Sequence, residues 1–343
     1  MSSFIFWIRQ FQCLWSNWRR LRWQRFASLM LLTLLTCGLL TSCIRDPLPP
    51  LRVGAGIWTG YESLYLARSL GYYDTKSLRL VDYPNNSEIM RAFRNHDLDV
   101  ATLTTYEALV LAETMAKIKI ILVMDSSNGA DVILGQPELT ELQAIQSKRV
   151  GVESGALGAF MLTRALEHAK IDTKAVDVVS LGASEHEKAF QKKDVDAVVT
   201  YEPNRSKLLA IGANMLFDSS KIPDEILDVL VVHEELLEQR PEVLQNLVQG
   251  HFKALKYLAE NPRDGAQRVA PREGMTADQF IEALKGISLP DAAENQQLLS
   301  LQNHDMLQRV QRVSEFMHKT NLLRSTVSLT SLFSDRFVRD VQP

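Results

Sequence analysis

Short apolar runs alternate with amphipathic segments along the first half of the chain. Runs typical of buried strands and segments with apolar positions at helical spacing follow one another in order. The predicted strands are 51–57, 78–83, 100–103 and 118–124, and the predicted helices are 61–73, 87–95 and 105–117. The helix at 87–95 would be capped by Ser87, with Glu88 in its first turn. This alternation predicts βαβ units around a parallel sheet with helices on both faces.

A second series of the same kind follows. Its predicted strands are 148–153, 176–181, 195–200, 215–217 and 228–232, and its predicted helices are 155–169, 184–193 and 203–211. Five short motifs of the first series recur 93–97 residues later in the same order. These are Arg52-Val53-Gly54 (Arg149-Val150-Gly151), Ala92-Phe93 (Ala189-Phe190), Asp97-Leu98-Asp99 (Asp194-Val195-Asp196), Thr105-Tyr106-Glu107 (Thr200-Tyr201-Glu202) and Asp125-Ser126-Ser127 (Asp218-Ser219-Ser220). Five ordered matches favour two similar α/β lobes, although chance and the sequence pattern common to all βα units would explain some of them.

The last third of the chain has a different pattern. Apolar residues recur at helical spacing over residues 241–260, and shorter helices are expected at 276–285 and 306–318. We expect these helices to pack on the outside of the first lobe, without a role in chemistry.

The N-terminal segment reads as an export signal. Residues 1–42 contain five arginines and no acid, then a nearly unbroken apolar run over residues 26–40. Leu40-Thr41-Ser42-Cys43 resembles a bacterial lipobox, in which the cysteine becomes the lipidated first residue. Cys37 is a weaker candidate for that position, and an uncleaved membrane anchor is the alternative. We therefore expect a signal peptide at 1–42, lipidation at Cys43 and a short tether at 43–50, which would place the body outside the cytoplasm on a membrane anchor.

Composition narrows the function of the body. Without residues 1–42, 33 Lys and Arg face 41 Asp and Glu, a net charge of −8, which argues against nucleic-acid binding. No cysteine follows Cys43, so the body has neither a disulfide nor a thiolate metal site nor a cysteine nucleophile. The histidines lack metal-ligand spacing, and each is expected to be a surface or packing residue. No nucleophile elbow or phosphate loop is present, so we expect no enzyme, no cofactor and no metal site.

Candidate ligand residues lie where the predicted strands end, because ligands of open α/β sheets bind at the carboxyl ends of the strands. Trp58 is the one tryptophan outside residues 1–42, and it sits in a glycine-rich loop with Tyr61. Five acids fall at the same ends, and these loops contain no Lys or Arg except Lys221 and Arg205. Each acid alone would more often be a helix cap, but as a set they favour a ligand with an amine over a bare anion. The candidate ligand-binding residues are Trp58, Tyr61, Glu62, Thr104, Asp125, Ser126, Ser127, Asp131, Ser154, Gly155, Glu202 and Asp228.

Together these motifs resemble a known family. The stretch from Ile57-Trp58-Thr59-Gly60-Tyr61-Glu62 to Gly71-Tyr72-Tyr73, with Gly129-Ala130-Asp131 and Asp196-Ala197-Val198-Val199-Thr200-Tyr201-Glu202-Pro203, is similar to bacterial substrate-binding proteins of the nitrate/sulfonate/taurine type. These proteins serve ABC importers and have thiamine-pyrimidine-like relatives. The resemblance covers roughly residues 51–261.

The resemblance implies an α/β protein with a type II periplasmic-binding-protein fold, in which two lobes joined by two crossing segments close over a small molecule. The second lobe (128–220) would be inserted into the first (51–127 and 221–343). Together with the lipobox and the acids at the strand ends, it favours a lipid-anchored receptor that delivers a small organic solute, sulfonate- or taurine-like or amine-bearing, to a permease and its ATPase. The family's sulfonate or nitrate specificity does not carry over, because the basic groups expected for a bare anion are not evident in this sequence. The resemblance also implies ligand contacts from Trp58, Tyr61, the crossing at Ser126 to Asp131, and Ser154-Gly155. A thiamine-pyrimidine-type enzyme and a periplasmic sensor domain are the alternatives, and the sequence does not name the solute.

Overall fold

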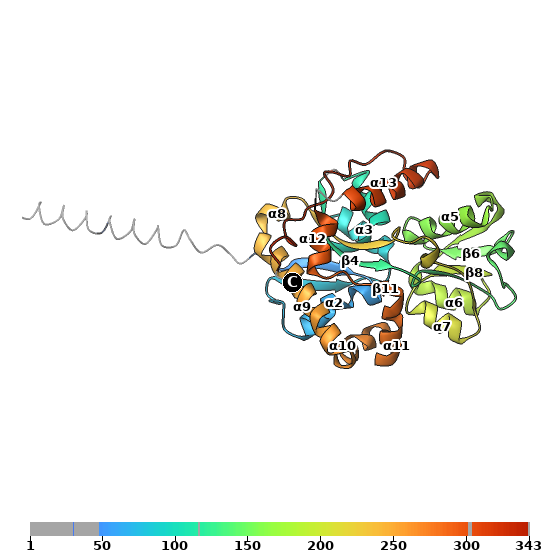
Figure 1. Cartoon of the computed structure of the whole chain (residues 1–343), viewed down its shortest axis with the longest axis horizontal. Helices are drawn as coiled ribbons and strands as arrows, with labels where there is room; N and C mark the ends of the chain where they lie inside the picture. Colours follow the sequence, from blue (N-terminus) through green and yellow to red (C-terminus); the bar gives the residue numbers. More distant parts are fainter. Residues whose placement is uncertain (1–29, 31–47, 116, 301–303, 342–343) are drawn as a thin grey trace, which may run out of the picture. The chain divides into compact units, whose positions relative to one another are not determined.

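The computed structural model describes residues 30, 48–115, 117–300 and 304–341. The predicted signal segment and Cys43 therefore lie outside the described residues, apart from Met30. Residues 50–343 form one compact unit, which Figure 1 shows as two groups of strands with helices around each. Among the described residues, no helix combines the length and the apolar character needed to cross a membrane.

The first lobe, called lobe 1, is built on a six-stranded sheet with the order β11-β4-β10-β3-β1-β2. Its strands are β1 (Leu51–Ala55), β2 (Leu78–Asp82), β3 (Val100–Thr104), β4 (Ile118–Ser127), β10 (Leu227–His233) and β11 (Ile287–Ser288). Its helices are α2 (Glu62–Ser69), α3 (Asn86–Arg94), α4 (Thr105–Ala112), α8 (Leu236–Gln239), α9 (Pro241–Glu260), α10 (Pro262–Val269), α11 (Ala277–Ala283), α12 (Ala292–Leu299) and α13 (His304–Lys319). The helices around this sheet come from two separate parts of the chain, α2 to α4 before lobe 2 and α8 to α13 after it.

The second lobe, called lobe 2, is built on a five-stranded sheet with the order β7-β6-β8-β5-β9. Its strands are β5 (Val132–Gly135), β6 (Arg149–Val152), β7 (Asp177–Ser180), β8 (Ala197–Thr200) and β9 (Asn214–Asp218). Its helices are α5 (Leu157–Ala169), α6 (His186–Gln191) and α7 (Asn204–Ala210), and Figure 1 shows α5 on one face and α6 and α7 on the other. A small cluster of buried side chains, including Val132, Phe190 and Leu208, fills the core under α6 and α7.

Both sheets are mixed, which corrects the predicted parallel sheets. In lobe 1, β10 runs antiparallel to β3 and β4, and in lobe 2, β5 runs antiparallel to β8 and β9. The reason is the route of the chain, because each of these strands enters its sheet directly after a crossing from the other lobe. Successive strands of a βαβ unit are parallel because a helix carries the chain back to the starting edge of the sheet. A strand that the chain enters from the other lobe has no such helix before it and can run antiparallel. Strand β5 was also absent from the predicted elements.

The same contacts recur in the two lobes, as the repeated motifs predict. The backbone N–H of Arg52 donates to Asp99 Oδ2 at 2.7 Å, and that of Arg149 donates to Asp196 Oδ2 at 2.9 Å. Each guanidinium also donates to the side chain of the same aspartate and to the backbone carbonyl three residues before that aspartate, which is His96 O in lobe 1 and Lys193 O in lobe 2. Equal contacts at a spacing of 97 residues support two related lobes.

Two repeated Asp-Ser-Ser segments meet where the chain crosses between the sheets. The Oγ atoms of Ser127 and Ser219 lie 2.8 Å apart, and Ser127 Oγ also accepts a hydrogen bond from the backbone N–H of Asp131. Ser219 Oγ accepts from the N–H of Gly129 at 2.6 Å. These bonds hold the two crossing segments against each other.

The cap of α3 differs from the prediction. Asn85, and not Ser87, caps this helix by accepting a hydrogen bond from the N–H of Glu88 at 2.9 Å. Ser87 instead donates its hydroxyl and its N–H to Glu153 Oε1 of lobe 2, at 2.7 and 2.9 Å. The helix starts one residue earlier than predicted, and the serine is free to bridge the lobes.

Candidate ligand-binding site

A small cavity lies between the two lobes, at the carboxyl ends of β1, β3, β6 and β8. Its volume is about 30 Å³, which holds one or two water molecules. Lobe 1 and lobe 2 both contribute to its wall, which consists of Ile57, Trp58, Tyr61, Asn86, Thr104, Glu107, Asp131, Glu153, Leu157, Gly158, Met161, His186, Val199, Thr200, Tyr201 and Asp228.

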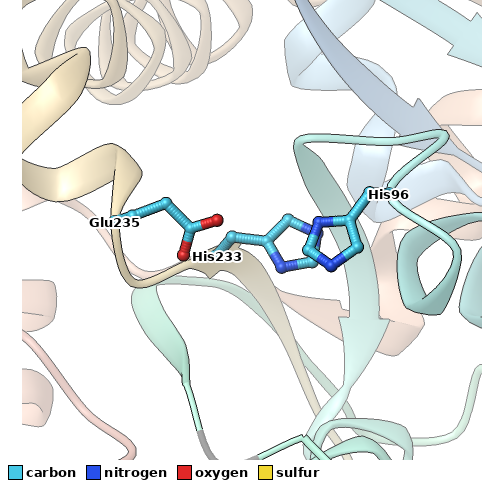
Figure 2. Close-up of side chains that lie close together, drawn as sticks. All are labelled: His96, His233 and Glu235. Atoms are coloured by element: carbon cyan, nitrogen blue, oxygen red, sulfur yellow. The ribbon is translucent and has the colours of Figure 1, made fainter.

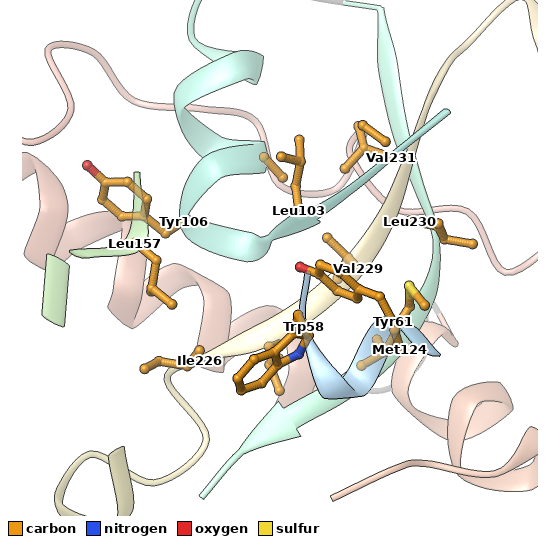
Figure 3. Packing of buried hydrophobic residues seen from close by; sticks show 14 of the residues in the cluster. Trp58, Tyr61, Leu103, Tyr106, Met124, Leu157, Ile226, Val229, Leu230 and Val231 are labelled. Carbon is orange, nitrogen blue, oxygen red and sulfur yellow. The ribbon is translucent and has the colours of Figure 1, made fainter. Parts of the chain in front are cut away.

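Direct contacts between the lobes surround this cavity. Ser87 of lobe 1 donates to Glu153 of lobe 2, and the N–H of Leu157 donates to Glu107 Oε1 at 3.3 Å. The rings of Trp58 and Tyr201 meet edge to face with centroids 5.6 Å apart. Trp58 and Leu157 belong to one cluster of buried side chains with residues near β10 (Figure 3). The lobes are therefore close together, and a solute larger than water enters only if they separate.

The loop after β1 places Trp58 and Tyr61 in this wall. A short 3-10 helix, Thr59–Tyr61, follows the extended Trp58 and turns both rings inward, where they are nearly fully buried. Gly60 is required there, because a Cβ atom on it would lie 1.9 Å from Asp125 Oδ2 and 2.6 Å from Trp58 Nε1. The glycine-rich loop of the sequence thus lets a carboxylate approach the backbone closely.

Two buried aspartates lie beneath the loop. Asp125 of β4 and Asp228 of β10 are neighbours across the two strands. Trp58 Nε1 donates to Asp125 Oδ2 at 3.1 Å, and the Tyr61 hydroxyl donates to Asp228 Oδ1. Burial raises the pKa of both carboxyls, and the charge of Asp125 raises the pKa of Asp228 further. We infer that this pair holds one proton at neutral pH, because two neighbouring buried carboxylates that are both ionised repel each other.

Three more carboxyls face the cavity. Glu107 completes the capping box of α4, with Oε2 accepting from the N–H of Thr104, and it also accepts from the amide of Asn86. Burial raises the pKa of Glu107 to about 7 and that of Asp131 to about 6, and it also raises the pKa of Glu153. Asp131 Oδ2 is buried and has no hydrogen-bond partner in the described protein.

His186 is a buried histidine that also lines the cavity. Its Nδ1 is 3.1 Å from Thr200 Oγ1, while Nε2 is buried without a partner in the described residues. Burial lowers its pKa to about 4, so the ring is neutral at physiological pH. Together with Asp131 Oδ2, it offers a polar atom to a molecule in the cavity.

A basic residue that the sequence did not indicate supports the loop from outside. Arg272 pairs with Glu62 and donates to Gly56 O, to the Tyr65 hydroxyl and to Asp82, with its guanidinium 3.6 Å from the centroid of the Tyr65 ring. Arg272 does not line the cavity.

The structure brings together some of the predicted site residues and separates others. Trp58, Tyr61, Thr104, Asp131 and Asp228 line the cavity, and Asp125 lies directly behind them. The remaining predicted residues, which are outside the wall, are Glu62 (paired with Arg272), Ser126 and Ser127 (on the crossing), Ser154 and Gly155 (in an exposed turn) and Glu202 (paired with Arg205).

Sequence reasoning missed several residues of the wall. Glu107, Glu153, His186, Tyr201 and Asn86 were not among the predicted ligand residues. The recurrence of Thr105-Tyr106-Glu107 as Thr200-Tyr201-Glu202 was the available signal for Glu107 and Tyr201.

The order β2-β1-β3-β10-β4, its counterpart in lobe 2 and the cavity between them define the class: this is an α/β protein with the type II periplasmic-binding-protein fold. Residues 45–271 match the sequence profile of the NMT1-like family. The chain belongs to this family, as the motif resemblance predicts.

Individual relatives agree with this assignment. A taurine-binding periplasmic protein of Escherichia coli (strain K12) is 23% identical over 210 residues, which cover 60% of this chain and 65% of that protein, just under two thirds of its length. The alkanesulfonate-binding protein SsuA from Xanthomonas axonopodis pv. citri, bound to MOPS, superposes with a TM-score of 0.70 at 15% identity, covering 84% of this chain and all of that one. The desulfurization enzyme DSZB also superposes, with a TM-score of 0.64 at 18% identity, covering 85% of this chain and 98% of that one. The fold is therefore shared by binding proteins and by an enzyme.

Proposed function

We propose that this protein is the substrate-binding component of an ABC importer and that it captures a small organic solute carrying a protonated amine. The solute would occupy the cavity between the lobes and be passed to a permease driven by an ATPase. Family membership, the two-lobed fold and the similarity to a taurine-binding protein support the importer role.

The negative charge of the cavity is the observation that favours a solute with an amine. Five carboxyls line or directly back it, from Glu107, Asp125, Asp131, Glu153 and Asp228, and no Lys or Arg is among the described lining residues. An ammonium group would gain from each carboxylate that it faces, whereas a bare anion would meet repulsion in a poorly solvated site. Two buried atoms without partners, Asp131 Oδ2 and His186 Nε2, would accept or donate hydrogen bonds to the bound molecule.

Capture would depend on closure of the lobes. The rings of Trp58, Tyr61 and Tyr201 give the cavity apolar faces, and a cation next to such faces gains further attraction. Closure over the solute would remove water and strengthen each of these contacts.

Three small ligands separate the amine from the sulfonate. Taurine carries both groups, ethanesulfonate only the sulfonate and ethanolamine only the amine, at nearly the same length. Titration calorimetry should show that taurine and ethanolamine bind more tightly than ethanesulfonate. If ethanesulfonate binds as well as ethanolamine, the amine is not what the cavity recognises. Native mass spectrometry of protein purified without denaturation would then identify the solute carried from the cell.

We also propose that Cys43 carries a lipid and holds the protein on the outer face of a membrane. Support comes from the sequence around Leu40-Thr41-Ser42-Cys43 and from the similarity to a taurine-binding periplasmic protein. Replacing Cys43 by serine should move the protein from the membrane fraction to the soluble fraction. A Cys37→Ser variant serves as the control and should remain membrane-bound.

A further inference from the structure

A second cluster of ligating side chains lies at the opposite end of the lobe 1 sheet. His96 follows α3, His233 ends β10, and Glu235 lies two residues later, before α8. One ligand atom from each residue lies within 4.8 Å of the other two. Figure 2 shows the three side chains close together. Strand β10 runs from Asp228 in the cavity wall to His233, so this cluster is separate from the cavity.

His233 is already oriented as a metal ligand. Its Nε2 lies 3.2 Å from the carbonyl oxygen of Leu98, and because a carbonyl only accepts, Nε2 carries the proton. The neutral ring therefore presents a lone pair on Nδ1. A backbone carbonyl that fixes the tautomer of a histidine in this way is typical of ligands in metal sites.

The surroundings hold the His233 ring in place, while the other two ligands are exposed to solvent. The ring is buried between Phe93, at a centroid distance of 4.1 Å and an angle of 3°, and His96, at 4.2 Å and 18°. The His96 and His233 rings are nearly parallel, so the nitrogen lone pairs of the two rings do not point at one common position. The His96 ring must therefore tilt before both histidines can bind the same ion. His96 and Glu235 are exposed, which gives both side chains room to move and gives an ion access from solvent.

Charge in the neighbourhood is compatible with a cation. Glu235 brings one negative charge to the cluster. Arg52, whose guanidinium donates to the carbonyl of His96, is paired with Asp99, so its positive charge is balanced. Glu234 is paired with Lys119 at 3.1 Å.

We propose that His96, His233 and Glu235 form a binding site for one divalent transition-metal ion of the zinc type. Two imidazole nitrogens and one carboxylate are a ligand set for Zn²⁺, Co²⁺, Ni²⁺ or Cu²⁺, whereas Ca²⁺ and Mg²⁺ require oxygen ligands. With three protein ligands, the ion keeps a coordination position for water or for another molecule. Binding would tie the end of α3 to the end of β10 and the start of α8.

The test is titration of the purified protein with ZnCl₂ alone at pH 7.5, followed by calorimetry. We expect one ion per chain and a rise in the thermal unfolding midpoint, with neither effect from CaCl₂ or MgCl₂. The exposed ligands are replaced in His96→Ala and Glu235→Gln, which should each weaken zinc binding by at least about tenfold. His168→Ala is the matched control, because it removes another exposed histidine that also has a glutamate neighbour, and it should bind zinc unchanged.

Three outcomes would overturn the proposal. They are no zinc binding by the unaltered protein, unchanged affinity in both His96→Ala and Glu235→Gln, and an equal loss of affinity in His168→Ala. The last two would mean that zinc associates with surface histidines in general. Co²⁺ absorption provides a second measurement, because its visible bands should be lost in His96→Ala together with the zinc affinity.

Discussion

Replacing Asp131 by asparagine tests the electrostatics of the cavity most directly. Asp131 is buried in the wall, its Oδ2 has no partner among the described residues, and burial raises its pKa from 3.8 to about 6. Asparagine is the nearest uncharged analogue of the protonated carboxyl, so the substitution removes the charge and changes the shape little.

The magnitude follows from the shift in pKa. A group whose pKa is higher in the folded state binds its proton more tightly there, so stability falls as pH rises from the unfolded pKa to the folded pKa. A shift from 3.8 to about 6 corresponds to roughly 3 kcal/mol, at about 1.4 kcal/mol for each pKa unit. Asp131→Asn should therefore leave stability unchanged near pH 3 and raise it by up to about 3 kcal/mol at pH 8, with most of the change between pH 4 and 6.

Urea unfolding followed by circular dichroism at pH 3, 5 and 8 measures this difference. Asp340→Asn provides the control, because Asp340 is exposed and far from the cavity wall, and its stability profile should follow that of the unaltered protein. A stability loss in Asp131→Asn that is equal at every pH would refute the reasoning, since it would mean that the charge of Asp131 is compensated. The same variant should bind an amine more weakly at pH 8, so that a gain in stability accompanies a loss of function.

Three further results are expected. Arg272→Met should lower stability by about 3 kcal/mol, because the buried Glu62 loses its partner, and chemical denaturation compared with Arg263→Met at an exposed pair would show it. Trp58→Phe should cost about 1–3 kcal/mol, because Asp125 loses the indole N–H, and a thermal melt that matches the unaltered protein would contradict this. Amine affinity should rise between pH 5 and 8, because the cavity carboxyls have raised pKa values and ionise in this range. At the lower pH, an amine that binds must displace protons from these carboxyls. Calorimetry in two buffers of different ionisation enthalpy would detect the released protons, and pH-independent affinity without proton release would count against the amine.

Much of the fold was readable from the sequence because it depends on local patterns. Apolar runs placed β1 to β4 and most of β6 to β10, with errors of a few residues at their ends. The 97-residue recurrence around Arg52 and Arg149 indicated two lobes, because the same buried contacts need the same residues. Helices α8, α10 and α12 were missed, since each is short and has few apolar positions.

The site was readable only where it follows from sheet geometry. Parallel strands bring their carboxyl ends to one edge, so Trp58 and Thr104 could be expected near each other. Asp228 reaches the same edge because β10 is antiparallel to β3 and begins there. No such rule predicts which residues of lobe 2 face them across the cavity.

What the sequence by itself determined is therefore most of the series of strands and helices, the repeated motifs, the glycine-rich loop around Trp58 and the excess of acids at strand ends. Tertiary structure alone decided that Asp125 and Asp228 lie side by side, that His186 faces the cavity, and that Arg272 holds the loop. The physical reason is that local propensity and periodicity act within a few residues along the chain. Burial and charge pairing, which raise or lower pKa values and decide which polar atoms stay available, depend on residues that meet only when the two lobes pack together.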